Sequence, residues 1–189
     1  SQFHLGRNLG NIRVEIGSWE GMPVDAARNS LVIDAREAKA RWIWFVDSDV
    51  FVPPGALMYM MQWRLPILSG LVYGKQNNGA ALWRLNTDNK TYTPVKQFPR
   101  PGLIEVDALP MGCCLIDMRV FDVMPYPWFK WEILDPLKEA GTGRLSEDFY
   151  FCREAAKANF RLFCYTGIEC GHEHTQVKAP DGTVIREAG

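Results

Sequence analysis

Residues 42–54 read WIWFVDSDVFVPP, an apolar run that ends in two aspartates separated by one serine. The run from Trp42 to Val46 predicts a strand that is buried on both faces, as in the middle of a parallel sheet. Asp47 and Asp49 follow at its carboxyl end, where ligands bind in doubly wound sheets. We therefore expect an α/β fold with its functional site at the end of this strand.

The two aspartates suggest a metal site. Carboxylates beside a core strand are costly to bury unless a positive charge compensates them. Their hard oxygens suit Mg2+ or Mn2+, which take one or two protein carboxylates and complete their shell with substrate phosphates. Alternatively, Asp47, Ser48 and Asp49 only form a turn, which these residue types favour. The D-x-D pattern alone does not decide between the two interpretations.

The flanking sequence alternates expected strands and helices, which is typical of an α/β layered domain. Helices are expected over residues 24–40, 53–63 and 147–158, the last with Ser146 as its N-cap. Further strands are expected at residues 11–17, 67–73, 80–85, 91–95, 103–106, 109–117 and 161–165. Residues 124–131, rich in proline and aromatics, are expected to form an ordered loop.

Composition narrows the function classes. The 189 residues fit one domain, and 47% hydrophobic with 23% charged residues indicate a globular chain. A net charge of -1 gives no reason to expect nucleic acid or an anionic membrane as the main partner. No apolar run is long enough to span a bilayer. Five cysteines, an odd number without CxxC, indicate buried, reduced thiols and a cytoplasmic setting.

His172 and His174 are further candidate metal ligands, because residues i and i+2 of an extended segment face the same way. One alternative is an exposed polar tail. Another is structural zinc, since Cys170 would share that face, although no fourth ligand is evident.

Glu147 and Asp148 open an expected helix whose buried stripe is Phe149, Cys152, Ala156 and Phe160. Acidic residues in a first turn are favoured by the helix dipole alone. A carboxylate in the first turn of the helix can, however, also orient or deprotonate an acceptor hydroxyl.

The remaining candidates have two interpretations each. Arg28, beside Asn29 on the first helix, has the donors to pair with a phosphate, yet surface arginines are commoner. Lys75 shares this ambiguity. Trp128 and Phe129 form either an apolar platform for a sugar ring or part of the core.

Seven blocks occur in a fixed order: ARN, WIWFVDSDVFVPP, ILSGLVYG, MGCCLIDMRVF, PWF, SEDFYFCREA and CGHEH. This order resembles the GT-A nucleotide-sugar glycosyltransferases, in their bacterial, archaeal and phage-type branch with a D-x-D, from about Ala26 to His174. The resemblance implies a GT-A (Rossmann-like) fold with a mixed, mainly parallel sheet flanked by helices. It places a nucleotide-binding half at about residues 1–75, an acceptor and metal half at about 76–175, and a tail at 176–189.

The resemblance also implies roles for single residues. Asp49 would bind the metal directly, and Asp47 would contact the ribose or a metal-bound water. His172 matches the third metal ligand of the family, with His174 as its competitor. Met111, Gly112 and Cys113 would lie under the donor sugar. Glu147 and Asp148 would face sugar hydroxyls, and the aspartate is the base in inverting members.

The chain departs from the family pattern at its start. The family begins with a strand that holds the nucleobase, and no such strand precedes Ser1. Residues 1–9 are instead expected to match the helix that follows that strand.

The function implied is metal-dependent sugar transfer from a UDP- or GDP-sugar to a carbohydrate or other hydroxyl acceptor, with Mn2+ or Mg2+ as cofactor. Hexosyl transfer is expected. The alternatives are a sugar nucleotidyltransferase, which shares this metal chemistry, and a non-catalytic carbohydrate-binding or zinc-stabilised module.

Overall fold

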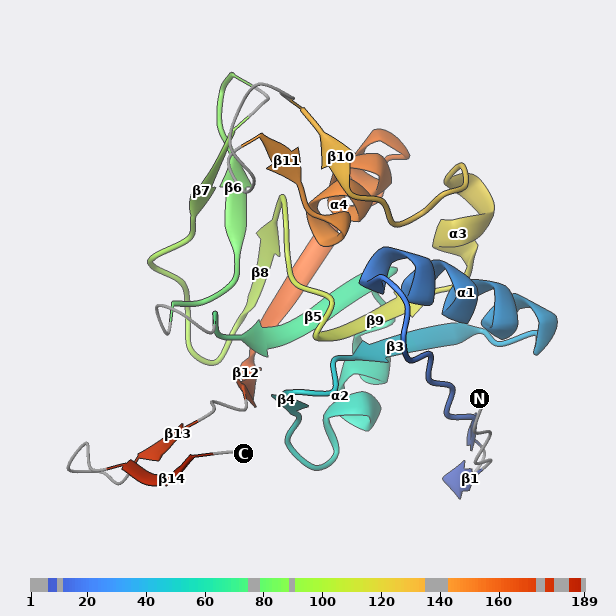
Figure 1. The fold of residues 1–189 in the computed structure, drawn as a ribbon, viewed down its shortest axis with the longest axis horizontal. Coiled ribbons are helices and arrows are strands. Elements are labelled where there is room, and N and C mark those ends of the chain that lie inside the picture. Colours follow the sequence, from blue (N-terminus) through green and yellow to red (C-terminus); the bar gives the residue numbers. More distant parts are fainter. Residues whose placement is uncertain are drawn as a thin grey trace.

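In the computed structural model, the described residues are 7–9, 12–74, 79–88, 91–134, 143–172, 176–178 and 184–187. They form a mixed α/β structure around a central sheet (Figure 1). The helices in the described residues are α1 (Val24–Glu37), α2 (Ala56–Trp63), α3 (Arg119–Val123) and α4 (Glu147–Lys157).

The central sheet has the strand order β3-β9-β5-β12-β4, and β8 also pairs with the first part of β12, at residues 162–165. Its strands are β3 (Trp42–Val46), β4 (Val50–Phe51), β5 (Ile67–Val72), β8 (Leu103–Val106), β9 (Cys113–Asp117) and β12 (Leu162–His172). The pair β5–β12 is parallel, and the other pairs are antiparallel.

The expected mainly parallel sheet is therefore wrong, although the α/β class and the mixed sheet are confirmed. The physical reason is β9, which lies antiparallel between β3 and β5. Ile116 of β9 is the register partner of both Ile43 and Ile67, so β3 and β5 share a direction without pairing. Within the described residues β3 is an end strand, and Val46 is exposed. The expectation that β3 is buried on both faces is thus also wrong.

The described part of the chain also contains four antiparallel strand pairs outside this sheet. They pair β1 (Arg7–Leu9) with β2 (Ile12–Val14), β6 (Trp83–Leu85) with β7 (Tyr92–Pro94), β10 (Glu132–Ile133) with β11 (Arg144–Leu145), and β13 (Gln176–Lys178) with β14 (Val184–Glu187). The strand expected at residues 11–17 is confirmed only at Ile12–Val14. The helix expected over residues 1–9 is wrong for residues 7–9, which are β1.

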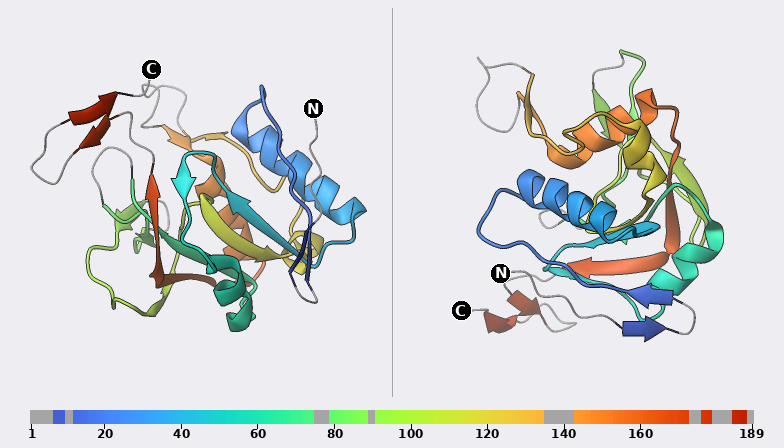
Figure 2. Two further views of the ribbon diagram at one scale, coloured as in Figure 1. Left: turned by 90° about the horizontal axis from the view of Figure 1, so that it is seen from below. Right: turned by 90° about the vertical axis from the view of Figure 1, so that its right-hand side faces the viewer.

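Helices cover the two faces of the sheet unequally. α1, α3 and α4 pack on one face and α2 lies alone on the other, as Figure 2 shows. The buried stripe expected on α4 is partly wrong: Cys152 is buried, but Phe151 and Ala155 replace Phe149 and Ala156. Phe149 packs instead against rings of the β6–β7 hairpin, Trp83 and Tyr92.

All five cysteines are buried. None of the helices in the described part of the chain is long and apolar enough to cross a bilayer.

Candidate functional site

Asp47 follows β3 directly, and its backbone is held from both sides. Its N–H donates to the Gly112 carbonyl at 3.2 Å, and its own carbonyl accepts from Val50 N–H at 3.0 Å. The second bond closes the tight turn through Ser48 and Asp49. The Asp47 side chain is 39% exposed. The aspartates thus lie at the carboxyl end of β3, as the sequence predicted, and both are partly exposed to solvent.

Arg28 joins this turn to the start of α4. It lies on α1, is only 5% exposed, and donates from Nη2 to Asp47 Oδ1 at 2.9 Å. Its other terminal nitrogen, Nη1, donates to Glu147 Oε1 in a buried ion pair. The guanidinium carbon also lies 5.9 Å from the centre of the Phe129 ring. One buried cation therefore holds carboxylates from two distant parts of the sequence, and the interpretation of Arg28 as a surface residue is wrong.

Glu147 and Asp148 have different surroundings although they are neighbours. Glu147 is buried at 6% exposure, and burial raises the pKa of its carboxyl, with the adjacent Asp148 adding to the shift and Arg28 opposing it. Asp148 is half-buried and accepts hydrogen bonds from Ser146 Oγ and from Phe149 N–H at 3.1 Å. Ser146 is the N-cap residue of α4, as expected, but its side chain makes no cap hydrogen bond to the backbone. Of the two carboxylates, only Glu147 pairs with the Arg28 bridge.

Asn29 is committed to the loop that carries Trp128 and Phe129. Its amide donates to the carbonyls of Asp25 at 2.9 Å and Phe129 at 2.7 Å. Its oxygen accepts from the N–H groups of Trp128 and Phe129, both at 3.1 Å. These bonds use the two donors and two lone pairs of the amide, so no capacity remains for the expected cofactor contact. Trp128 and Phe129 are themselves buried, which favours the core over a sugar platform.

Gly112 lies against the aspartate turn. A Cβ at this position would sit 3.2 Å from Asp47 Oδ2 and 3.0 Å from Val50 Cγ2. Met111 and Gly112 are both buried beside the aspartate turn. The absence of a side chain thus lets the start of β9 approach the carboxylate of Asp47 closely.

Compared by sequence, the chain matches no protein-family model and no curated protein. Compared by structure, it is similar to A197 from STIV, with a TM-score of 0.61 and 16% identity over 89% of this chain and 78% of that one. It is also similar to GalNAc-T7, solved with UDP, GalNAc and Mn2+, with a TM-score of 0.51 and 14% identity over 80% of this chain and 30% of that one. At such identities the likeness concerns the fold alone.

The chain has a GT-A glycosyltransferase-like fold. In this GT-A-like fold the end of β12 reaches the aspartate turn. The backbone of His172 is the register partner of Val50, the residue after Asp49. His174 lies outside the described residues, as does Lys75. Among the described residues no group of three or more His, Cys, Asp or Glu side chains is arranged to hold a metal ion.

Cys170 does not suit the zinc alternative. Its thiol is fully buried, and a hydrogen bond with Cys113 and burial both raise its pKa. Zinc binds the thiolate, and a raised pKa opposes its formation. The carboxylate oxygens of Asp47 and Asp49 are of the hard type that Mg2+ and Mn2+ prefer.

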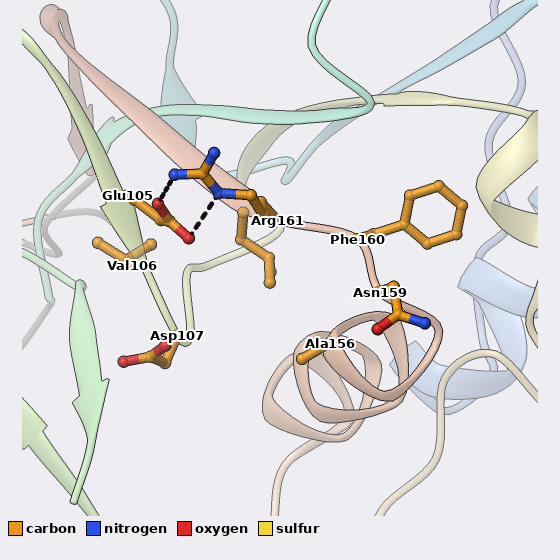
Figure 3. A pocket seen from close by; sticks show the side chains of 8 residues that line it. Glu105, Val106, Asp107, Ala156, Asn159, Phe160 and Arg161 are labelled. Carbon is orange, nitrogen blue, oxygen red and sulfur yellow. Dashed lines mark hydrogen bonds and ion pairs between the residues drawn. The ribbon is translucent and has the colours of Figure 1, made fainter.

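A separate hollow of about 300 Å³ lies between β8 and the end of α4 (Figure 3). It is lined by Glu105, Val106, Asp107, Ala156, Asn159, Phe160, Arg161 and Leu162. These residues come from the end of β8, the carboxyl end of α4 and the amino end of β12. The candidate site lies at the opposite ends of α4 and β12. This hollow is therefore not part of the aspartate site.

Proposed function

We propose that the chain is a metal-dependent glycosyltransferase that moves a sugar from a nucleoside-diphosphate sugar to a hydroxyl acceptor. The observation that carries the proposal is the Arg28 bridge between Asp47 and Glu147. A turn with only a structural role would not need a buried arginine that also pairs with the first residue of α4. A site that aligns a donor with an acceptor would need such an arginine, because small displacements of the reacting groups lower the reaction rate strongly.

The proposed metal ligands are Asp49, Asp47 and one of the histidines His172 and His174. Two carboxylates suit Mg2+ or Mn2+, because these ions complete their shell with water and substrate phosphates. The register of His172 with Val50 supports its candidacy. When bound, the ion would supply electrostatic stabilisation of the leaving nucleoside diphosphate. Met111 and Gly112 would then form the surface beneath the donor sugar.

The two carboxylates at the start of α4, Glu147 and Asp148, would have different roles toward the acceptor. Glu147 is buried and paired with Arg28, so we assign it to positioning. Asp148 is only half-buried, and its hydrogen bonds from Ser146 and Phe149 both go to one oxygen, Oδ1. We therefore propose Asp148 as the carboxylate that orients or deprotonates the acceptor hydroxyl, with Glu147 as the second choice.

The test is product analysis with a panel of UDP- and GDP-hexoses and Mn2+. We expect release of nucleoside diphosphate and its loss, by at least about a hundredfold, in Asp49→Asn. Asp122→Asn is the matched control, because Asp122 is an exposed carboxylate on α3. Release of pyrophosphate from a sugar phosphate and a nucleoside triphosphate would instead identify a nucleotidyltransferase. Full metal-dependent transfer by Asp49→Asn would refute the metal assignment.

A further inference from the structure

A polar cluster lies at the carboxyl end of β5, outside the Arg28 bridge. The Tyr73 hydroxyl donates to Glu169 Oε2 of β12 at 3.1 Å. The Arg100 guanidinium lies 5.8 Å from the centre of the Tyr73 ring and 4.7 Å from that of Phe98. Its Nη1 lies 4.0 Å from Glu169 Oε1, which is longer than a hydrogen bond. A carboxylate, a phenol and a guanidinium thus come together without a close ion pair.

This cluster shares an edge of the sheet with the aspartate turn. The N–H of Asp47 donates to the Gly112 carbonyl. The antiparallel register of β9 with β5, continued by two residues, sets Gly112 opposite Leu71. Leu71 is in turn the register partner of Glu169. The four positions therefore form one row across the ends of β3, β9, β5 and β12 (Figure 1). At about 4.8 Å for each strand spacing, Glu169 lies roughly 14 Å from Asp47.

Asp47 and Glu169 also lie on the same face of the sheet. Tyr73 packs against the core cluster on the side of α1 and α4. Cys170 belongs to the cluster on the α2 side, so the preceding Glu169 points toward the face of α1. Asp47 is on that face because it pairs with Arg28 of α1. A ligand bound on this face can therefore extend from one carboxylate to the other.

The proposed acceptor carboxylate, Asp148, faces the middle of this row. Cys152 lies one turn after Asp148 on the same side of α4, and its thiol donates to the Leu109 carbonyl at 3.6 Å. Leu109 leads into β9, which lies between β3 and β5. The side of α4 that carries Asp148 thus turns toward the segment between the aspartate turn and the Tyr73 cluster.

Backbone bonds hold Arg100 and Glu169 in place. Thr166 of β12 is 1% exposed. It exchanges two bonds with Gly102, both at 2.9 Å, and its hydroxyl donates to the Pro99 carbonyl. Arg100 is thereby fixed between two residues that are bonded to β12. The register of β12 shifts just before Glu169, and such bulges are common beside active sites. Exposed ion pairs stabilise little, so this fixed presentation favours ligand binding over a structural role.

The chemistry of the cluster suits a neutral ligand with several hydroxyls. Burial and the bond to Glu169 raise the pKa of Tyr73, while Arg100 opposes the shift, so the phenol keeps its proton at neutral pH. Glu169 offers only acceptors, Arg100 only donors, and the phenol both. Adjacent sugar hydroxyls, which each donate and accept, match this set. The carboxylate disfavours an anionic ligand, and the guanidinium disfavours a cationic one.

We propose that Tyr73, Arg100 and Glu169 form the acceptor subsite and that the acceptor is a neutral saccharide. Hydroxyls of the saccharide bond to these side chains, so that another hydroxyl of the same molecule faces Asp148. The donor sugar then occupies the space toward Asp47. This inference rests on the proposed sugar transfer. A lone hydroxyl of another acceptor class would need only Asp148 and would leave the cluster without a ligand.

The test is saturation-transfer NMR of the full chain with the methyl glycosides of glucose, galactose, mannose and N-acetylglucosamine. We expect at least one glycoside to bind. Glu169→Gln should weaken its binding at least about tenfold, because a bond to a charged group is lost, and Tyr73→Phe about fivefold. Glu105→Gln is the matched control, because Glu105 also pairs with an exposed arginine but lies beside the separate hollow. It should bind as the wild type does.

Thermal shift with UDP or GDP and Mn2+ separates this subsite from the donor site. Glu169→Gln and Tyr73→Phe should keep the nucleotide response of the wild type, and their unfolding transitions confirm that they are folded. Two outcomes would overturn the subsite: no binding of any of the glycosides, or equal binding by the wild type and Glu169→Gln. Glycoside binding that depends on Glu169 without any nucleotide response would support the saccharide site and refute the proposed sugar transfer.

Discussion

At the scale of single residues, Arg28 is the contact on which the candidate site depends. It is nearly fully buried between Asp47 and Glu147. Only a guanidinium group has two terminal nitrogens that can each pair with a different carboxylate in this way. Its neighbour Asn29 is also buried but serves the loop at Trp128. Two adjacent residues of α1 thus have different roles, one in the candidate site and one in a buried loop beside it.

Arg28→Ala should lower the free energy of unfolding by about 3 kcal/mol, because it leaves the buried Glu147 carboxylate without its cation. Arg28→Lys should fold better but remain inactive, since one ammonium cannot bridge both carboxylates. Urea unfolding and nucleoside diphosphate release measure the two effects. The control Arg13→Ala, at an exposed arginine of β2, should cost less than about 0.5 kcal/mol. A similar cost for Arg13 and Arg28 would contradict the bridge.

Glu147 should make stability depend on pH. Burial raises its pKa in the folded chain, so the native state keeps this proton to a higher pH than the unfolded state does. The stability of the wild type relative to Glu147→Gln should therefore fall as pH rises from about 4.3, the ordinary glutamate value, through the raised folded pKa. Urea unfolding at a series of pH values measures the difference. A relative stability that rises over this window would show that the Arg28 pair outweighs burial.

At the scale of elements, the strand that carries the aspartates and the helix that follows the S-E-D motif were predictable. Both depend on local patterns: β3 on an apolar run, and α4 on acidic residues ahead of a 3.6-residue repeat. The antiparallel β9 was not, because pairing direction depends on contacts between residues far apart in sequence. For the same reason the sequence could not distinguish a surface Arg28 from a buried one, since its partner Glu147 is 119 residues away.

The loop of Trp128 and Phe129 should depend on Asn29. Asn29→Ala removes an amide that bonds two N–H groups and a carbonyl of this buried loop, so we expect a loss of about 3 kcal/mol in unfolding free energy. Near-ultraviolet circular dichroism should also report a change at Trp128. Asn86→Ala is the control, since its side-chain bonds to Thr91 and Thr93 are exposed, and it should cost less than about 1 kcal/mol. Equal losses would show that Asn29 does not anchor the loop.

At the scale of the whole molecule, the fold brings three distant motifs to one end of the sheet. β3 delivers the aspartates, α4 delivers Glu147 and Asp148, and the end of β12 delivers the backbone of His172. The order of the motifs in the sequence predicted that they lie close together. The strand registers that bring them together are known only from the structure.

The most direct test of the central claim is thermal-shift binding of UDP and GDP, each with and without Mn2+, to the wild type, Asp49→Asn and Asp122→Asn. The account predicts that one nucleotide raises the melting temperature of the wild type and of Asp122→Asn only with Mn2+, and that Asp49→Asn shows no rise. A rise that persists without Mn2+ or in Asp49→Asn, or no rise under any condition, would contradict a metal-dependent donor site at Asp47 and Asp49.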